Sequence, residues 1–218
     1  MSFPHELPGL GRLLAVCRRL ALRVKTSAPV HDSPQAGALL AGLPFDPILA
    51  AVYVRFSHAA FATDVAGIIL RHCDGGGRTL ATDNTWWGES YRNQLALPTF
   101  IFAGEALAAS HYATIPELAD AQGHQPVVKV DVHERPYALP VASTVDHLFE
   151  AYSHYLEALL ALPHARDEGD ALLLFPRDVP HIIGRDAQLV ASIRAGRFDR
   201  LMPGADEQAW ARMVLSGS

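Results

Sequence analysis

The strongest constraint in this sequence is a change of hydrophobic period between residues 126 and 160. Val128, Val130 and Val132 alternate with polar residues, as side chains on a half-buried strand do. From residue 145 onward, apolar residues recur at spacings of three and four, which is typical of one face of a helix. The chain therefore passes from a strand into a helix, and both must bury an apolar face against a core.

Two prolines and a Ser-Thr pair occupy this junction. Pro136 and Pro140 disfavour helix in the residues just before them, which predicts an extended segment. Ser143 or Thr144 can then cap the helix, and Asp146 suits the positive end of its dipole. We expect this corner to belong to the scaffold.

The remaining elements follow from the same periodicities and from turn residues. Asp46 can cap a helix that has Pro47 at its first position, while Asp178 and Asp186 can cap later ones and Gly196 can end one. Helices, then local antiparallel strands, then helices indicate an α+β fold. The expected helices cover 8–25, 43–56, 145–160 and pieces of 161–218; the strands cover 65–70, 97–103, 108–115 and 126–134; a linker covers 26–37 and a polar loop 71–94.

This pattern predicts three parts within one compact domain. An N-terminal amphipathic helix (1–28) packs on an α+β core (38–160), and a helical extension (161–218) follows. The 218 residues suffice for a core without a disulfide or a structural metal.

Composition limits the classes of function. The net charge of −5, from 18 basic and 23 acidic side chains, argues against a nucleic-acid binder. Cys17 and Cys73 are the only cysteines, too few for a disulfide framework. Neither a signal peptide nor an apolar run long enough to cross a membrane is recognisable. We expect a cytoplasmic protein that does not bind membranes.

The sequence offers no recognisable catalytic or metal-binding motif. His147 and His154 share a helix side but lie seven residues apart, too far for two ligands of one ion. His72, Cys73 and Asp74 are adjacent, and adjacent side chains rarely converge on one metal. No nucleophile elbow or phosphate-binding loop occurs. We expect a protein without a cofactor or a metal, and not an enzyme.

A recognition surface is better supported, in the polar loop 71–94. The stretch DNTWWGESY combines large aromatic side chains, which often anchor protein contacts, with acidic ones. The alternative is that one or both tryptophans fold back to cover the sheet. The predicted partner-binding residues are Asp74, Asp83, Trp86, Trp87, Glu89 and Tyr91.

Three stretches together resemble the SUKH superfamily, the Smi/Knr-like immunity proteins of bacterial toxin systems. GLPFDPILAAVYVRF (42–56) resembles the leading Leu-Pro helix of that family, and LPTFIFAGEALAASHYAT (97–114) resembles its central hairpin. PVVKVDVHERPYALPVASTVDHLFEAYSHYLEAL (126–159) is similar to its closing strand, turn and last helix. Two features depart from the family pattern. SHAAFATD (57–64) replaces the usual asparagine–glycine turn, and the two ends of the chain lie outside the resemblance.

The resemblance implies a bent, mostly antiparallel sheet flanked by helices. It also implies a protein that binds and blocks a toxin made by the same cell, such as an effector of a polymorphic or type VI secretion system. The family shares a scaffold rather than a catalytic triad, so it assigns no site residue here. The oligomeric state stays open.

Two other functions remain open at this stage. The first is a regulatory or scaffolding module that docks to a cellular partner through residues 1–28. The second is a hydrolase with an unrecognised site near His72 and Asp83.

Overall fold

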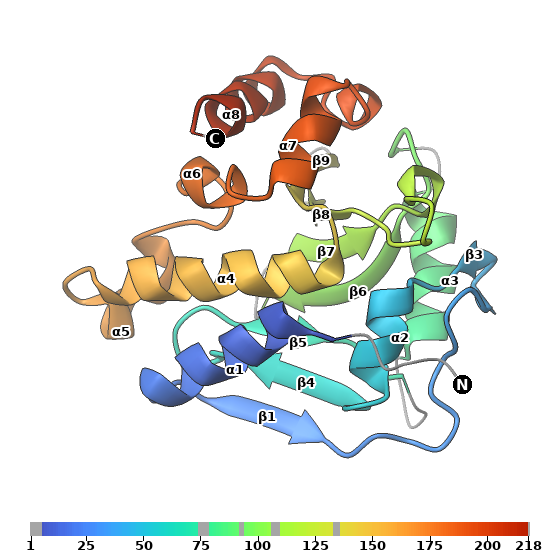
Figure 1. Cartoon of the computed structure of the whole chain (residues 1–218), viewed down its shortest axis with the longest axis horizontal. Coiled ribbons are helices and arrows are strands. Elements are labelled where there is room, and N and C mark those ends of the chain that lie inside the picture. The colour runs from blue at the N-terminus through green and yellow to red at the C-terminus, as the bar shows by residue number, and fades with distance from the viewer. Residues whose placement is uncertain (1–5, 74–78, 92–93, 106–109, 133–135, 218) are drawn as a thin grey trace.

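The computed structural model describes residues 6–73, 79–91, 94–105, 110–132 and 136–217. Within them, seven strands form one sheet in which every neighbouring pair is antiparallel. The sheet order is β1-β4-β5-β6-β7-β8-β9, so each strand pairs with the next along the chain once the separate β2–β3 hairpin is set aside (Figure 1). The strands are β1 (Val24–Ser27), β4 (His58–Phe61), β5 (Ile68–Leu70), β6 (Phe100–Glu105), β7 (Ser110–Thr114), β8 (Val127–Asp131) and β9 (Tyr137–Ala142), and the hairpin is β2 (Leu39–Leu40) with β3 (Leu43–Pro44).

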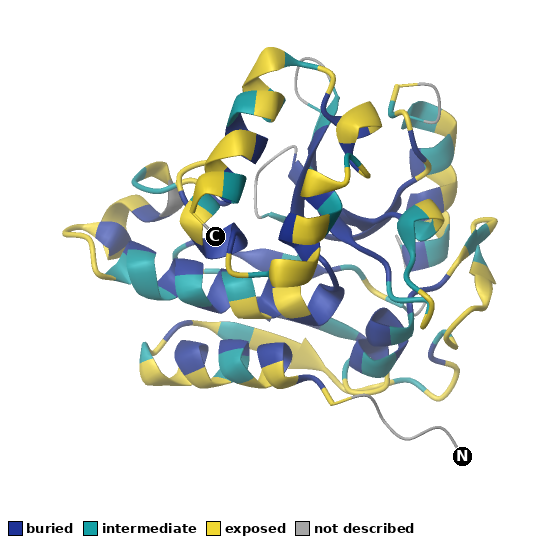
Figure 2. Ribbon diagram, turned by 45° about the horizontal axis from the view of Figure 1, so that its top comes forward, coloured by how far each residue is buried: buried dark blue, intermediate teal, exposed yellow. Residues whose placement is uncertain are grey.

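Helices pack around this sheet, which confirms the predicted α+β class with an N-terminal helix and C-terminal helices. Figure 1 shows α4 lying along the sheet, α1 beside α4, and α6 to α8 gathered above them. Figure 2 shows buried residues concentrated on the faces where these helices meet the sheet and one another. The helices are α1 (Pro8–Arg19), α2 (Pro47–Tyr53), α3 (Leu80–Tyr91), α4 (Val145–Leu160), α5 (Ala165–Glu168), α6 (Pro180–Ile183), α7 (Ala187–Arg194) and α8 (Ala205–Ser216), with short 3-10 turns at Pro116–Leu118, Gly169–Ala171 and Asp199–Leu201.

The strand-to-helix junction forms as the sequence predicts. β9 is extended through Pro140 to Ala142, and Thr144 is the N-cap of α4, accepting a hydrogen bond from the His147 N–H at 3.2 Å. The apolar face of α4 is buried in the core, and its members are Val145, Leu148, Phe149, Tyr152, Leu156 and Leu159.

Asp146 lies in the first turn of α4 and also bonds to the first turn of α1. Its carboxylate accepts hydrogen bonds from the N–H groups of Gly9 at 2.8 Å and Leu10 at 2.9 Å. These donors belong to the first turn of α1, which has no side-chain cap of its own. Because a helix N-terminus carries unpaired N–H groups and partial positive charge, one buried carboxylate stabilises the starts of two helices.

The predicted helices 8–25 and 43–56 are too long, and β1, β4 and the β2–β3 hairpin were not predicted. α2 covers only Pro47–Tyr53, because Leu43–Pro44 belong to β3, and the extended segment predicted before α4 is the strand β9. α1 ends at Arg19, Ala21 has a φ of 51°, and β1 follows in what was expected to be helix and linker. β1 pairs with β4, which lies in the SHAAFATD stretch that carried no recognised signal. Both are four residues long, too short for hydrophobic alternation to distinguish a strand from a turn.

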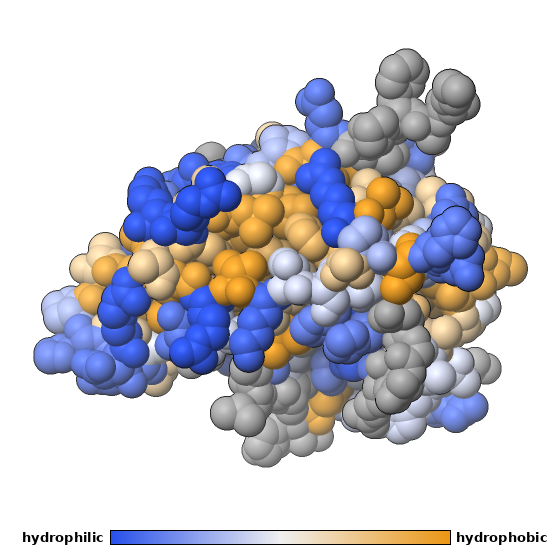
Figure 3. All heavy atoms as spheres, turned by 90° about the horizontal axis from the view of Figure 1, so that it is seen from below, coloured by the Kyte–Doolittle hydropathy of each residue, from blue (hydrophilic) through white to orange (hydrophobic). Residues whose placement is uncertain are grey.

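The two edges of the sheet are protected differently. At β1, Lys25, Thr26 and Ser27 are exposed, and a short polar edge strand with a lysine resists pairing with another chain. Figure 3 views this side of the molecule, where a hydrophobic area crosses the middle of the face and hydrophilic side chains lie around it. At the opposite edge β9 is buried, because α7 and the 199–201 turn pack against it.

The C-terminal extension is joined to the core by polar contacts as well as apolar ones. Asp186 caps α7 as predicted, accepting from the Leu189 N–H at 3.0 Å, and also accepts from the Ser143 N–H at 2.6 Å. Gly196 follows the end of α7 with a φ of 69°, as expected of a helix stop.

Asp178 was predicted to be a helix cap, and this is wrong. It accepts from the Leu174 N–H at 2.8 Å, while α6 begins after Val179 with no side-chain cap.

The contact between α1 and α4 predicts opposite effects for two neighbouring glycines. A Cβ added to Gly9 would lie 2.0 Å from the backbone oxygen of Asp146, whereas one added to Gly11 meets nothing within 4 Å. We therefore expect Gly9→Ala to lower the free energy of unfolding by at least ~2 kcal/mol, because the helices must separate. Gly11→Ala should raise it by roughly 0.5–1 kcal/mol, because alanine favours helix. Urea unfolding of both variants measures this, and equal effects would contradict the packing.

Candidate partner-binding surface on α3

The predicted polar loop 71–94 contains a helix, which corrects the sequence-based expectation. α3 spans Leu80–Tyr91. It starts with a reciprocal pair in which Thr82 Oγ1 accepts from the Thr79 N–H at 2.8 Å, and Thr79 Oγ1 accepts from the Thr82 N–H at 3.3 Å. This Thr-x-x-Thr arrangement is a helix-start signal of the capping-box kind, which the adjacent glycines obscured. Those glycines, with Asp74, lie outside the described residues.

One side of α3 is fixed to the sheet. Trp87 is 2% exposed, and its indole N–H donates to Thr99 Oγ1 at 2.8 Å. Asn84 Oδ1 accepts from the Ile101 N–H at 2.7 Å, and its amide group donates to the Ile101 carbonyl at 2.8 Å. Trp87 is thus the tryptophan that folds back onto the sheet, and any contribution it makes to partner binding is indirect.

Asp83 also faces inward. Its side chain is 5% exposed and forms an ion pair with the guanidinium of Arg71, which directly follows β5. Arg71 also contacts His111 Nδ1 at 3.2 Å, and His72 stacks on His58 with ring centroids 4.0 Å apart. A carboxylate engaged by a guanidinium fits a role in fixing α3 to β5 better than a role as a general base.

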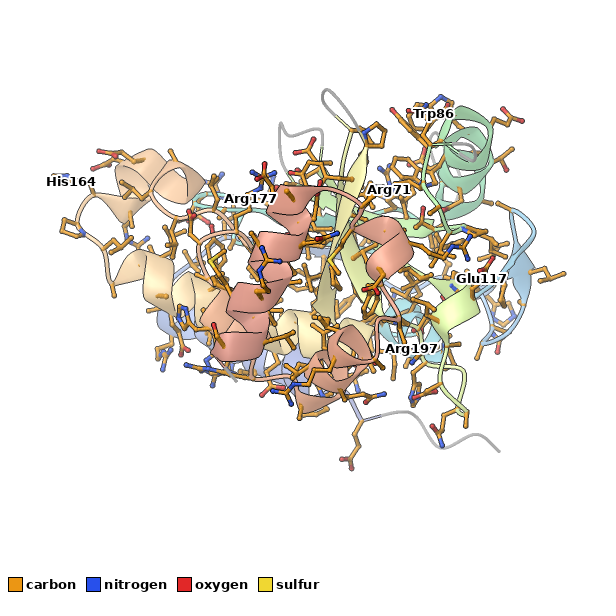
Figure 4. The ribbon with its side chains drawn as sticks, turned by 90° about the horizontal axis from the view of Figure 1, so that it is seen from above. Arg71, Trp86, Glu117, His164, Arg177 and Arg197 are labelled. Atoms are coloured by element: carbon orange, nitrogen blue, oxygen red, sulfur yellow. The ribbon has the colours of Figure 1, made fainter. Side chains whose placement is uncertain are left out.

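The other side of α3 carries the predicted residues that reach solvent. Trp86 is 42% exposed, Glu89 is exposed and Tyr91 is half-buried. The rings of Trp86 and Tyr91 meet edge to face, with centroids 5.9 Å apart. Figure 4 places Trp86 at the periphery of the molecule. We call Trp86, Glu89 and Tyr91 the outer face of α3.

An apolar hollow of about 300 Å³ adjoins this outer face, between α3 and the β2–β3 hairpin. Asn84 and Thr99 line it, and both have partners, since Asn84 bonds Ile101 and Thr99 accepts from Trp87. Sequence reasoning missed this hollow because its walls come from distant segments with no shared local pattern. The lining residues are Ala41, Gly42, Leu43, Asn84, Trp87, Gly88, Tyr91, Leu95, Leu97, Pro98 and Thr99.

Comparisons of the chain with protein-family models, curated proteins and solved structures found no match. The resemblance to the SUKH superfamily therefore stays a prediction based on three stretches of sequence. The same holds for the class of partner that it implies.

The structure also brings together a serine, a histidine and an aspartate at the start of α4. Ser143 Oγ lies 2.7 Å from His147 Nδ1, and Asp186 Oδ2 lies 3.5 Å from the same nitrogen. In a catalytic triad the serine and the carboxylate contact different nitrogens of the imidazole ring. This group instead joins α4 to the cap of α7, so it is a structural clamp rather than a nucleophile and its base.

Three other features bear on chemistry and location. Burial raises the pKa of the Cys17 thiol to about 11, so its nucleophilic thiolate form is suppressed. In the part of the chain that the structure describes, no three His, Cys, Asp or Glu side chains gather closely enough to hold a metal ion. No helix within the same residues combines the length and apolar character needed to cross a bilayer.

The clamp predicts a pH-dependent stability whose sign follows from two shifted pKa values. The interaction with Asp186 raises the pKa of His147 above 6.5, despite the opposing effect of burial. The pKa of Asp186 is lowered although its burial opposes this, because His147 and two backbone N–H groups favour the carboxylate. A raised histidine pKa stabilises the fold below the unfolded value and loses this effect as the pH rises through the folded value. The advantage of the native chain over His147→Gln in unfolding free energy should therefore be larger at about pH 5.5 than at about pH 8.5.

His154 provides a control of opposite sign on the same helix. Burial, followed by the charges of Arg12 and Arg185, lowers its pKa below 6.5, so acid favours the unfolded state at this position. The advantage of the native chain over His154→Gln should shrink as the pH falls. Urea unfolding of both variants at the two pH values tests the clamp, and parallel pH profiles would contradict it.

Proposed function

We propose that this protein is a stoichiometric inhibitor of the immunity type, which binds a toxin made by the same cell and covers its active surface. The observation that carries the proposal is the outer face of α3, where a half-exposed tryptophan stands beside an apolar hollow on a firmly held helix. A rigid aromatic anchor next to a pocket is a typical centre of a protein–protein interface. The α+β fold, with a strand leading directly into the covering helix, agrees with the resemblance to SUKH proteins.

Charge supports a basic partner. The chain carries a net charge of −5, and Glu89 places a carboxylate beside Trp86 on α3. Such a field accelerates the association of a basic protein more than it tightens the final complex. The proposal places this binding in the cytoplasm, where the free cysteines Cys17 and Cys73 would stay reduced.

The competing functions have less support. A module that docks through residues 1–28 would need a free apolar face on α1, but Leu10, Leu13 and Cys17 are fully buried in the core. A hydrolase would need an available base near His72, and the Asp83 carboxylate is engaged by Arg71. Both arguments favour binding through α3.

Co-expression with the toxin-like product of an adjacent gene tests the proposal. We expect cells that carry both proteins to survive and the two proteins to co-purify in a fixed ratio. Cell death at the same rate with and without this protein, together with failure to co-purify, would exclude the function. Turnover of a toxin substrate by this protein alone would favour the hydrolase.

The two tryptophans of α3 should separate binding from stability. Trp86→Ala should weaken toxin binding by at least ~2 kcal/mol and leave the unfolding free energy nearly unchanged, because the side chain packs only in part. Trp87→Ala should lower the unfolding free energy by roughly 3–5 kcal/mol, because it empties a core position beside Thr99. Calorimetric titration and urea unfolding of each variant measure the two effects. An unchanged dissociation constant for a folded Trp86→Ala protein would move the interface away from α3.

A further inference from the structure

A second cavity, of about 360 Å³, lies between α4 and the segment that joins α6 to α7. It belongs to elements other than α3 and plays no part in the proposed function. Its volume is in the range typical of small-molecule sites, and it combines an apolar floor with several polar side chains. The lining residues are His147, Glu150, Ala151, His154, Ile182, Arg185, Asp186, Ala187 and Gln188.

Some of these polar groups are already occupied by contacts within the protein. Asp186 accepts from the Ser143 and Leu189 N–H groups and interacts with His147, so it has little capacity left for a ligand. His154 Nδ1 lies 3.0 Å from the Arg12 guanidinium and 3.4 Å from that of Arg185. The Glu157 carboxylate also lies 3.4 Å from this nitrogen, and burial with the charges of Arg12 and Arg185 lowers the pKa of His154, so His154 is engaged by groups of the protein itself.

Two charged groups in the cavity remain available. Among the described residues, the Glu150 carboxylate has no hydrogen-bond or ion-pair partner, although its charge acts on His147 and His154. Arg185 is exposed and makes one side-chain contact, the 3.4 Å approach to His154, with no carboxylate partner in the described part of the chain. The two residues line the cavity from different segments, since Glu150 is on α4 and Arg185 precedes α7.

An apolar surface completes the cavity. Ile182 is buried, Ala151 is half-buried, and both line the cavity together with Ala187. A ligand that satisfies the cavity therefore carries an anionic group for Arg185, a cationic group for Glu150 and an apolar part for this floor. A metal ion does not fit, because no group of three potential ligands gathers among the described residues. A simple anion does not fit either, because the Glu150 carboxylate would repel it.

We infer that this cavity binds a small zwitterion of the α-amino-acid class. Arg185 holds the carboxylate, Glu150 holds the ammonium group, and an aliphatic side chain lies on Ala151, Ile182 and Ala187. A guanidinium paired with a carboxylate is among the stronger charge-assisted contacts, and its planar geometry gives it direction. The bound ligand bridges α4 to the α6–α7 segment, so it also stabilises the docking of the C-terminal extension.

Leucine is the probe of choice, with two analogues that each lack one charge. Isocaproate lacks the ammonium group, and isoamylamine lacks the carboxylate. We expect leucine to bind the full chain with a dissociation constant of about 1 mM or lower and to raise its melting temperature. Each analogue should bind at least about tenfold more weakly, because one charge in the cavity is left unpaired. Calorimetric titration and thermal unfolding provide the two measurements.

Matched substitutions assign any binding to the cavity. Glu150→Gln and Arg185→Gln should each weaken leucine binding about tenfold or more, since each removes one charge-assisted contact. Glu117→Gln and Arg212→Gln change the same residue types at exposed positions on other elements, and should leave binding unchanged. Absence of leucine binding, equal binding of isocaproate, or binding that survives both cavity variants would each overturn the inference.

Discussion

The fold depends on the carboxylate of Asp146. It lies in the first turn of α4 and also accepts hydrogen bonds from the first turn of α1, so the two helices begin at the same point. Gly9 makes this possible, because any side chain there would occupy the space of the α4 backbone. Farther along, Glu157 of α4 forms ion pairs with Arg12 and Arg19 of α1. Because the Asp146 contact is buried, its loss would leave backbone donors without partners, whereas these more exposed ion pairs contribute little.

With α4 fixed in this way, the rest of the molecule is positioned from it. The Tyr152 hydroxyl donates to the Ala66 carbonyl before β5, and the Tyr155 hydroxyl donates to the Leu173 carbonyl in the C-terminal extension. His147 and Ser143 hold the cap of α7. One helix, α4, therefore joins the sheet, α1 and the C-terminal helices in a single hydrophobic core, although the strands of the sheet pair mainly with their neighbours in sequence.

At the candidate site, buried side chains likewise fix one helix, α3, against the sheet. Asn84 and Trp87 hold one side of α3 against β6, and Asp83 holds it to Arg71. With one side fixed, Trp86 is presented to solvent without a large loss of conformational freedom on binding. The sequence singled out this segment but could not separate the two tryptophans, because which of them is buried depends on how α3 packs against β6.

The sequence by itself determined the α+β class, the passage from an extended segment into the helix now seen as α4, and the caps at Asp46 and Asp186, and it limited the cap of α4 to Ser143 or Thr144. These features depend on the hydrophobic period and on side chains that bond backbone groups only a few residues away. A short stretch of sequence is therefore enough to predict them. Only the tertiary structure decided that Asp146 caps α1, that Asp83 is paired with Arg71, and that Glu150 and Arg185 face one cavity. Asp146 is far along the chain from α1, and Glu150 is tens of residues from Arg185. All three pairings depend on how the elements pack, and a local sequence pattern does not predict that packing.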